Sequence, residues 1–349
     1  MALNGARFKC ICYIDRLCYA RHDSCMKRTC LIAGFTAFAL TACASVATRL
    51  PDISLPALET EREAQEASAF AEMERLHMRL WDVAYPVLAN NAALCPKTRP
   101  DIGAVTYSLK TFPKDMRDAA ARELGAKDMP SVRRVIKGGA AEAAGVKAGD
   151  VFLDARGIAT SARGKSMRAL LKDGPAALSV KRGDEVFKVT LTPREICDYG
   201  VKLSMRSTVN AYASGKTITL TSGMMNFTQS DDELALIVAH ELAHNTMGHI
   251  RKIVTNMIFS GFATRYTRPF ESEADYVGLY YLVRAGYSPD ETQKLWQRMA
   301  LIGPRSVARA KSHPTYPDRY LRLEAARAEI AAKQAASLPL TPNFKGADK

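Results

Sequence analysis

Three kinds of pattern are missing from this sequence of 349 residues. The net charge of +13 comes from scattered basic residues, without a basic run interleaved with aromatics and without a nucleic-acid-binding motif. We therefore interpret the charge as a solvated basic surface and expect no nucleic acid among the partners. No period of 20–50 residues recurs, which excludes a repeat array. The apolar runs at residues 31–40 and 253–263 are too short to span a bilayer.

The amino-terminal region has the layout of a signal peptide. Lys27 and Arg28 precede the short apolar run at residues 31–40. The run ends in the sequence LTAC, which resembles the bacterial lipobox, whose cysteine is lipidated and becomes the first residue of the mature protein. This resemblance implies that Cys43 anchors the protein in the outer membrane, facing the periplasm. A plain signal peptide with an incidental cysteine is the alternative.

Composition and periodicity divide the chain into segments. Residues 1–25 lengthen the charged leader beyond what is usual, so we expect translation to start at Met26. The predicted segments are a leader (1–42), a lipid-anchored tether (43–57), an amino-terminal helical part (58–100), an inserted domain (101–195), the main carboxy-terminal domain (196–336) and a loose tail (337–349).

The first part of the mature chain reads as helix. Apolar residues recur at helical spacing from about Leu58 to Asn90, with Pro86 marking a candidate break. A shorter helix is expected at about Lys114 to Leu124. After Cys197 we expect strands at Val201–Ser207 and Thr217–Thr221.

The inserted segment is β-rich and punctuated by glycine. It contains Gly-Ala-Ala at 139–141, the sequence AGVKAGD at 144–150 and Arg-Gly at 156–157. These elements resemble the signature of a bacterial PDZ domain, with strands at Ala177–Lys181 and Val186–Leu191 to complete it. The resemblance implies a module that binds peptide ends. A generic small β-domain is the alternative.

Few cysteines remain once the leader is set aside. Of eight cysteines, Cys43, Cys95 and Cys197 lie beyond residue 42. If Cys43 carries lipid, the other two form a pair in an oxidising compartment, where disulfides persist. They flank the inserted domain, so the sequence favours a disulfide between them over two unrelated buried thiols.

Three of the six histidines fall within residues 238–249, which read VAHELAHNTMGH. Ser230 and Glu233 form a capping box at the start of this helix. His240 and His244 then lie at i and i+4 on one face, where two imidazoles can bind one zinc ion. Glu241 lies beside that face, where a carboxylate can accept a proton from a metal-activated water. The alternative is a buried helix whose histidines are only structural.

His249 is the obvious candidate for a third ligand, but its spacing is wrong. In the pattern H-E-x-x-H-x-x-G-x-x-H the last histidine follows the first by ten residues, whereas His249 follows His240 by nine. If the helix continues at about 100° per residue, His249 faces away from His240. We therefore interpret His249 as a structural residue near the helix end.

A second apolar helix downstream carries the sequence ESEAD, with Glu271 and Asp275 at i and i+4. Together, HELAH and ESEAD resemble the gluzincin peptidase family that includes the CAAX prenyl endopeptidases, the heat-shock protease HtpX and BepA. The resemblance implies a mainly helical α+β domain with one zinc ion per chain. It makes Glu271 the third ligand and Asp275 the partner of the first histidine's other ring nitrogen. Glu273 is expected to point elsewhere, and Ala274 to let the two helices pack closely.

Two further stretches resemble this family. Before the zinc helix the family has a strand on the cleft edge, to which a substrate can add as an extended strand. The residues assigned to that strand are Asn210, Ala211, Thr219 and Thr221. The sequence SHPTYPDR makes His313 either a stabiliser of the oxyanion or a ligand to the zinc in a latent state, with Arg319 orienting it.

These features together predict a zinc-dependent metalloendopeptidase with an inserted PDZ-like domain. Its expected substrates are unfolded or misassembled proteins of the bacterial envelope, and its only membrane contact is the lipid anchor. The alternative is a metal-stabilised chaperone or scaffold with little proteolysis. Glu241 argues against the alternative, because a scaffold needs no base beside the metal.

Overall fold

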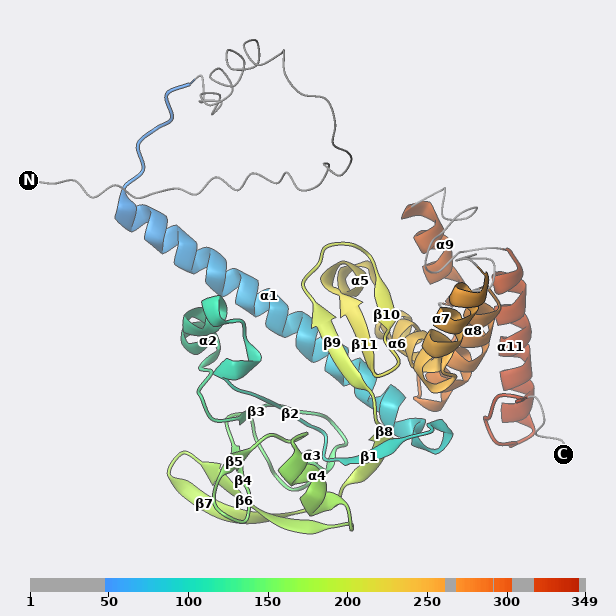
Figure 1. The fold of residues 1–349 in the computed structure, drawn as a ribbon, viewed down its shortest axis with the longest axis horizontal. Coiled ribbons are helices and arrows are strands. Elements are labelled where there is room, and N and C mark those ends of the chain that lie inside the picture. The colour runs from blue at the N-terminus through green and yellow to red at the C-terminus, as the bar shows by residue number, and fades with distance from the viewer. Residues whose placement is uncertain (1–47, 261–267, 291, 303–316, 345–349) are drawn as a thin grey trace, which may run out of the picture. The chain divides into compact units, whose positions relative to one another are not determined.

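The computed structural model describes residues 48–260, 268–290, 292–302 and 317–344 (Figure 1). The chain divides into two compact units, Met1–Leu55 and Pro56–Lys349. In the first unit, residues 48–55 are described and are exposed. The predicted signal peptide, the predicted lipidation site Cys43 and His313 lie outside the described residues.

The second unit mixes helices with small sheets, so the predicted α+β class is confirmed. Its described helices are α1 (Leu55–Asn90), α2 (Arg117–Leu124), α3 (Ala140–Ala143), α4 (Lys165–Leu171), α5 (Ser222–Phe227), α6 (Asp231–Thr246), α7 (His249–Ser260), α8 (Arg268–Arg284), α9 (Thr292–Ile302) and α11 (Pro317–Ala335). Short 3-10 helices lie at Ala92–Leu94, Leu109–Thr111 and Lys114–Met116. The described strands are β1 (Thr98–Asp101), β2 (Ala104–Tyr107), β3 (Ser131–Val135), β4 (Val151–Leu153), β5 (Ala159–Thr160), β6 (Ala176–Arg182), β7 (Glu185–Leu191), β8 (Arg194–Cys197), β9 (Gly200–Ser204), β10 (Ala211–Ala213) and β11 (Thr217–Thr221).

The long helix α1 passes through Pro86 without a break, although proline removes one helical hydrogen bond. Tyr85, Val87 and Leu88 flank the proline and are buried in the main core. Burial of these side chains outweighs the lost hydrogen bond, because each large apolar group contributes about 1.5–3 kcal/mol. The candidate break before Pro86 is therefore wrong.

The inserted segment has a core of its own. A four-stranded antiparallel sheet of order β5-β4-β6-β7 packs with α4 around Phe152, Met167 and Val180. The insert also contacts α1 through charged groups. Arg134 pairs with Asp82 at 2.5 Å, and the Arg163 guanidinium lies 3.8 Å from the centre of the Trp81 ring.

The two ends of the insert are joined twice. Strands β1 and β8 pair antiparallel, with Thr98 opposite Cys197. Beside this pair, a disulfide links Cys95 and Cys197, whose Cα atoms are 5.5 Å apart. The predicted disulfide is thus present, and it closes the chain between the two necks of the insert.

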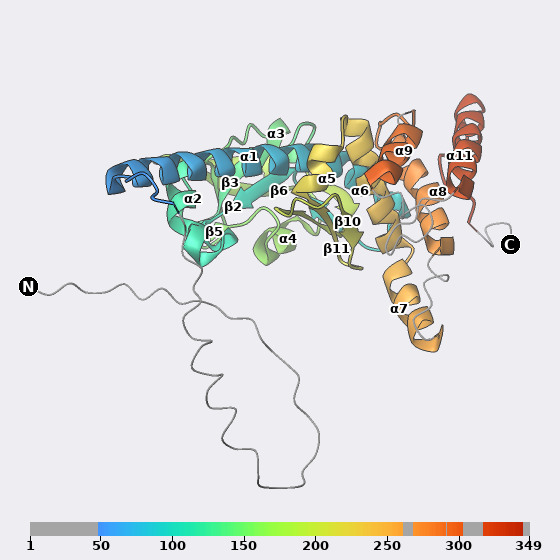
Figure 2. The ribbon, with the colours of Figure 1, turned by 90° about the horizontal axis from the view of Figure 1, so that it is seen from above.

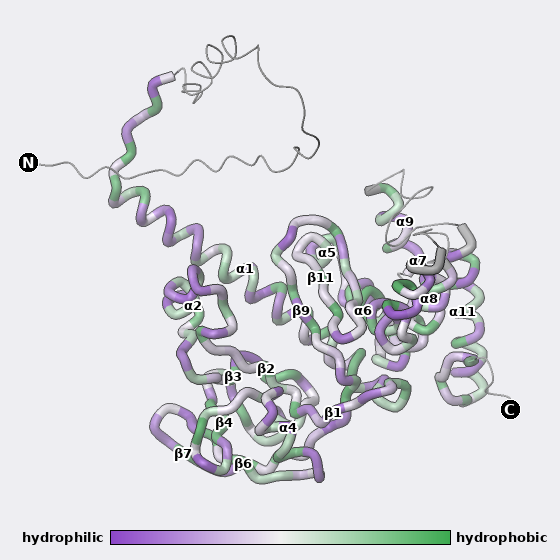
Figure 3. The backbone as a smooth tube through the Cα atoms, in the orientation of Figure 1, coloured by the Kyte–Doolittle hydropathy of each residue, from purple (hydrophilic) through white to green (hydrophobic). Residues whose placement is uncertain are grey.

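The main core surrounds α6. The side chains of α6 from Leu234 to Ala243 are buried on every face of the helix. Most of them are apolar, and Figure 3 draws apolar residues in green. Helix α8 packs along α6, and α11 packs against α8 (Figure 1). The three-stranded sheet β10-β11-β9 covers another side of α6. Among the helices of the described ranges, none is long and apolar enough to cross a membrane.

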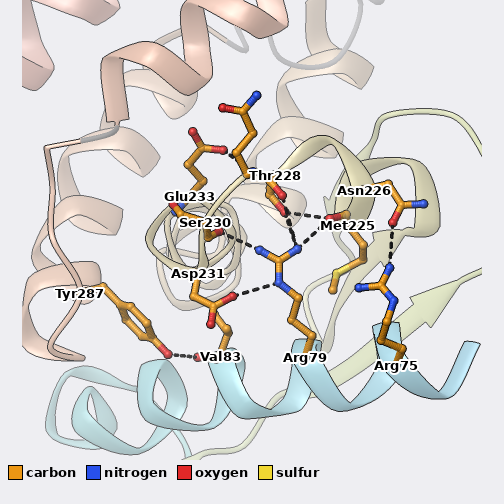
Figure 4. A network of polar contacts seen from close by, with 11 residues as sticks. Arg75, Arg79, Val83, Met225, Asn226, Thr228, Ser230, Asp231, Glu233 and Tyr287 are labelled. Carbon is orange, nitrogen blue, oxygen red and sulfur yellow. Dashed lines mark hydrogen bonds and ion pairs between the residues drawn. The ribbon is translucent and has the colours of Figure 1, made fainter. Parts of the chain in front are cut away.

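Helix α1 fixes the place where α6 begins. The Arg79 guanidinium reaches from α1 to Asp231 and also donates to the backbone carbonyls of Met225 and Ser230, at 2.8–2.9 Å (Figure 4). Thr228 accepts a further hydrogen bond from it. One arginine therefore satisfies several acceptors in the turn between α5 and α6 and holds that turn against α1.

Candidate metal centre

Helix α6 begins at the predicted cap, although only half of the predicted capping box forms. The Ser230 hydroxyl accepts a hydrogen bond from the Glu233 backbone N–H at 3.2 Å. The Glu233 carboxylate accepts from the Gln229 backbone N–H at 2.8 Å, one residue before the cap. It also pairs with Arg298 of α9, so this acidic group joins the start of α6 to a second helix.

The structure brings His240 and His244 of α6 together with Glu271 of α8. Their ligand atoms all lie within 4.8 Å of one another, and all three residues are buried. The two Nε2 atoms are 3.1 Å apart, and each lies 3.5 Å from an oxygen of Glu271. Two imidazoles and one carboxylate are a donor set that zinc accepts in sites with an open fourth position. The residues present therefore fit a zinc ion.

The close approach of α8 to α6 places Glu271 beside the histidines. Ala274 is buried at this contact, as expected, but the tightest point is Gly278. A Cβ at Gly278 would lie 3.1 Å from the Cα and the N of His240. The absence of a side chain at this position thus sets the helix separation that the site requires.

The buried ion pair of Asp275 and Arg319 supports His240 on the Nδ1 side of its ring. The Nδ1 of His240 lies 3.0 Å from Asp275 Oδ1, and Arg319 of α11 contacts both Asp275 oxygens. Burial favours the neutral ring, but Asp275 and Glu271 outweigh it and raise the pKa of His240 to about 10. Burial also opposes the Asp275 charge, yet Arg319 and His240 lower the pKa of that carboxyl. The surroundings therefore favour positive charge at this ring.

Glu241 is buried on α6 between the two histidines, 2% exposed. One residue corresponds to about 100° around the helix, so Glu241 lies beside the face that carries the histidines.

Sequence reasoning missed Trp296 of α9, whose ring centre is 5.7 Å from that of His240. The guanidinium of Arg319 lies 4.4 Å from the same indole ring. No motif marks Trp296, because its position depends on how α9 packs.

His249 was expected to face away from the two histidines predicted to bind zinc. Instead its ring contacts the ring of His244. Helix α6 ends at Thr246, and Gly248 at φ +66° breaks the helix before α7 starts at His249. The buried ring of His249 then reaches back, with Nδ1 3.0 Å from His244 Nδ1 and Nε2 2.7 Å from Glu273 Oε2. Burial lowers the pKa of His249, although Glu273 opposes this shift. The expectation failed because it assumed that one helix continues.

The assignment of the cleft-edge strand also needs correction. Ala211 lies in β10, an edge strand, and Asn210 comes directly before it. Thr219 and Thr221 lie in β11, which pairs antiparallel with β10 on one side and parallel with β9 on the other. Both are buried, and no hydrogen-bonding edge of β11 is left for a substrate strand. Thr219 and Thr221 therefore lie in the central strand of the sheet and not at its edge.

Comparison with known proteins agrees with this geometry. The family model for Peptidase family M48 matches residues 182–263 and 251–329, a region that includes the two-histidine, one-glutamate cluster. Residues 182–329, which these matches cover together, are similar to the M48 peptidase domain. The predicted enzyme class, a metalloendopeptidase, is confirmed at the level of this domain.

The M48 domain has relatives among mitochondrial metalloendopeptidases named OMA1. The chain is 27% identical to the Schizosaccharomyces pombe protein over 172 residues, which cover 40% of this chain and 51% of that protein. It is 28% identical to the Saccharomyces cerevisiae protein over 109 residues, covering 25% and 32% respectively. It is 28% identical to the Arabidopsis thaliana protein over 119 residues, covering 27% and 24%. The chain thus spans about half the length of the first of these relatives and less of the others.

Solved structures were also compared with this chain. The crystal structure of the HtrA3 PDZ domain bound to a phage-derived ligand (FGRWV) matches with 18% identity and a TM-score of 0.22. The match covers 28% of this chain and 89% of that one. At this TM-score the likeness carries no argument, so the PDZ-like nature of the insert stays a prediction.

Proposed function

We propose that the protein is a zinc-dependent endopeptidase of the bacterial cell envelope. It is anchored as an outer-membrane lipoprotein through Cys43 and hydrolyses unfolded or misassembled envelope proteins. The observation that carries the proposal is the cluster of His240, His244 and Glu271 with Glu241 beside it, inside a matched M48 domain. Membrane contact is through the lipid alone.

In this proposal each polar residue of the centre has one task. His240, His244 and Glu271 hold the metal through two nitrogens and a carboxylate. A bound zinc ion supplies Lewis acidity, which polarises the substrate carbonyl and lowers the pKa of a water molecule to about 7. Glu241 takes the proton from the attacking water as its oxygen bonds to the carbonyl carbon. Glu241 then gives that proton to the leaving nitrogen as the peptide bond breaks. Asp275 accepts the His240 Nδ1 proton, which keeps the Nε2 lone pair directed at the metal.

Two further parts of the proposal concern the substrate. An extended substrate pairs with the edge strand β10, which contains Ala211 and lies against α6. His313 stabilises the negative charge that develops on the carbonyl oxygen. The PDZ-like insert binds free chain ends of substrates, which fluorescence anisotropy with labelled carboxy-terminal peptides would test.

The variant Glu241→Gln tests the mechanism. The amide keeps the size of the side chain and cannot act as a base, so we expect one zinc ion per chain and casein cleavage at least about 100-fold slower. The control is Glu324→Gln, which removes an exposed carboxylate of α11. If Glu241→Gln cleaves casein as fast as wild type, the mechanism is wrong. Comparing new protein termini in the envelope of cells with either form then identifies substrates, whereas equal in-vivo rescue by both forms would favour a scaffold.

A further inference from the structure

His249 occupies a place for which the proposed mechanism gives no role. It is fully buried at the start of α7, and its two ring nitrogens contact two different polar groups. One is the His244 ring of α6, and the other is the Glu273 carboxylate of α8. Figure 2 shows α7 lying beyond the end of α6, so the contact between the two rings is made across the helix break at Gly248.

If His244 binds a metal through Nε2, the contacts determine where each proton lies in this chain of groups. His244 Nε2 is directed at His240 and Glu271, so it supplies the lone pair for a metal. A neutral imidazole with a free Nε2 carries its proton on Nδ1. That proton is donated to His249 Nδ1, 3.0 Å away. The remaining proton of His249 then lies on Nε2 and is donated to Glu273 at 2.7 Å.

We propose that His249 and Glu273 are positioning residues for the metal ligand His244. Glu273 orients His249, and His249 in turn fixes the tautomer and the ring plane of His244. The proposal deepens the proposed metal site and rests on it. The phenyl ring of Phe270 lies 5.0 Å from the His249 ring and restricts it on another side.

The two ligand histidines are thereby supported in different ways. His240 contacts the carboxylate of Asp275 directly, and that carboxylate is 3% exposed. The Nδ1 side of His244 reaches a carboxylate through His249, and this carboxylate belongs to Glu273, whose side chain is 42% exposed. The support of His244 therefore ends at the protein surface, where a substitution is accommodated without loss of the fold.

Zinc release measures this support separately from catalysis. Wild type and variants are loaded with one zinc ion per chain, and transfer of zinc to a chromogenic chelator is followed. His249→Leu removes both contacts, so we expect release about 10- to 100-fold faster. His249→Asn retains an acceptor near Nδ1 and should restore part of the difference. Cobalt(II)-substituted His249→Leu should also show a changed visible absorption spectrum.

Glu273 provides the version of the test that does not disturb the core. Glu273→Ala should accelerate zinc release and Glu273→Gln, which still accepts a hydrogen bond, should do so less. The matched control is Glu324→Ala, because that side chain is 45% exposed and also belongs to an ion pair. Circular dichroism checks that each variant is folded. If His249→Leu does not fold, zinc release from the two Glu273 variants decides whether the positioning role is correct.

Two negative results have different meanings. If wild type retains zinc and cleaves casein while Glu273→Ala and folded His249→Leu release zinc at the wild-type rate, the positioning role is refuted and the proposed function stands. If wild type does not retain zinc, the proposed function fails and the positioning role fails with it.

Discussion

Reduction of the disulfide between Cys95 and Cys197 should destabilise the protein by a predictable amount. The bond closes a loop of 102 residues. In the chain-entropy model a loop of this length restricts the unfolded chain by about 4.7 kcal/mol at 25 °C. The native state should change little, because β1 and β8 hold the same two necks together through backbone hydrogen bonds. The loss therefore falls on the unfolded state.

Urea denaturation followed by tryptophan fluorescence provides the assay. The two tryptophans are Trp81 in α1 and Trp296 in α9, and both belong to the main core, while Trp81 also contacts Arg163 of the insert. We expect the free energy of unfolding to fall by about 4–5 kcal/mol on reduction. The double variant Cys95→Ala/Cys197→Ala should lose about 1–2 kcal/mol more, because Cys197 is fully buried and the change leaves a cavity.

The outcome that refutes this reasoning is a reduced protein whose unfolding free energy lies within about 1 kcal/mol of the oxidised one. Separate unfolding of the insert is distinguishable. While the main core stays folded, β1 and β8 still hold the necks, so a transition confined to the insert should be insensitive to the disulfide. Only the transition of the main core, which Trp296 reports, should move.

Two further predictions concern the support of the metal centre. Gly278→Ala places a methyl group 3.1 Å from the His240 backbone. It should lower the unfolding free energy by about 1–3 kcal/mol in urea denaturation, and a loss below about 0.5 kcal/mol would mean that the helices adjust freely. Arg319→Lys replaces the two-pronged contact with Asp275 by a single one. Zinc affinity measured by chelator competition should fall about 10-fold, and unchanged affinity would exclude Arg319 from the support of His240.

Local periodicity was sufficient for the helix that carries the histidines. The spacing of His240 and His244 predicts one face of one helix, because i and i+4 positions are related by the helix itself. The third donor required a second helix, and only the family resemblance pointed to Glu271. The structure then places Glu271 within reach through the contact at Gly278, for which spacing along the chain gives no signal.

The sheet shows why the remaining assignment failed. The sequence before α6 has the alternation of a strand, and β11 forms at the predicted residues Thr217–Thr221. Whether a strand lies at an edge depends on its neighbours, and β11 pairs in parallel with β9, the strand that precedes β10 in the chain. Parallel pairing leaves no local turn signal, unlike a hairpin. The strand that lies at the edge beside β11 is therefore the short strand β10.

In the sequence ESEAD, one further acidic residue, Glu273, also contributes to the site, besides the expected Glu271 and Asp275. On a helix, Glu271 and Asp275 share one face, whereas Glu273 lies about 200° from Glu271. A single straight helix carrying the histidines could not contact Glu271 and Asp275 on one face of α8 and also Glu273 on the other. Because the helix breaks at Gly248, His249 reaches Glu273 and links that face to His244. Alternate acidic residues of α8 thus contact the predicted metal site, its first histidine and, through His249, its second histidine.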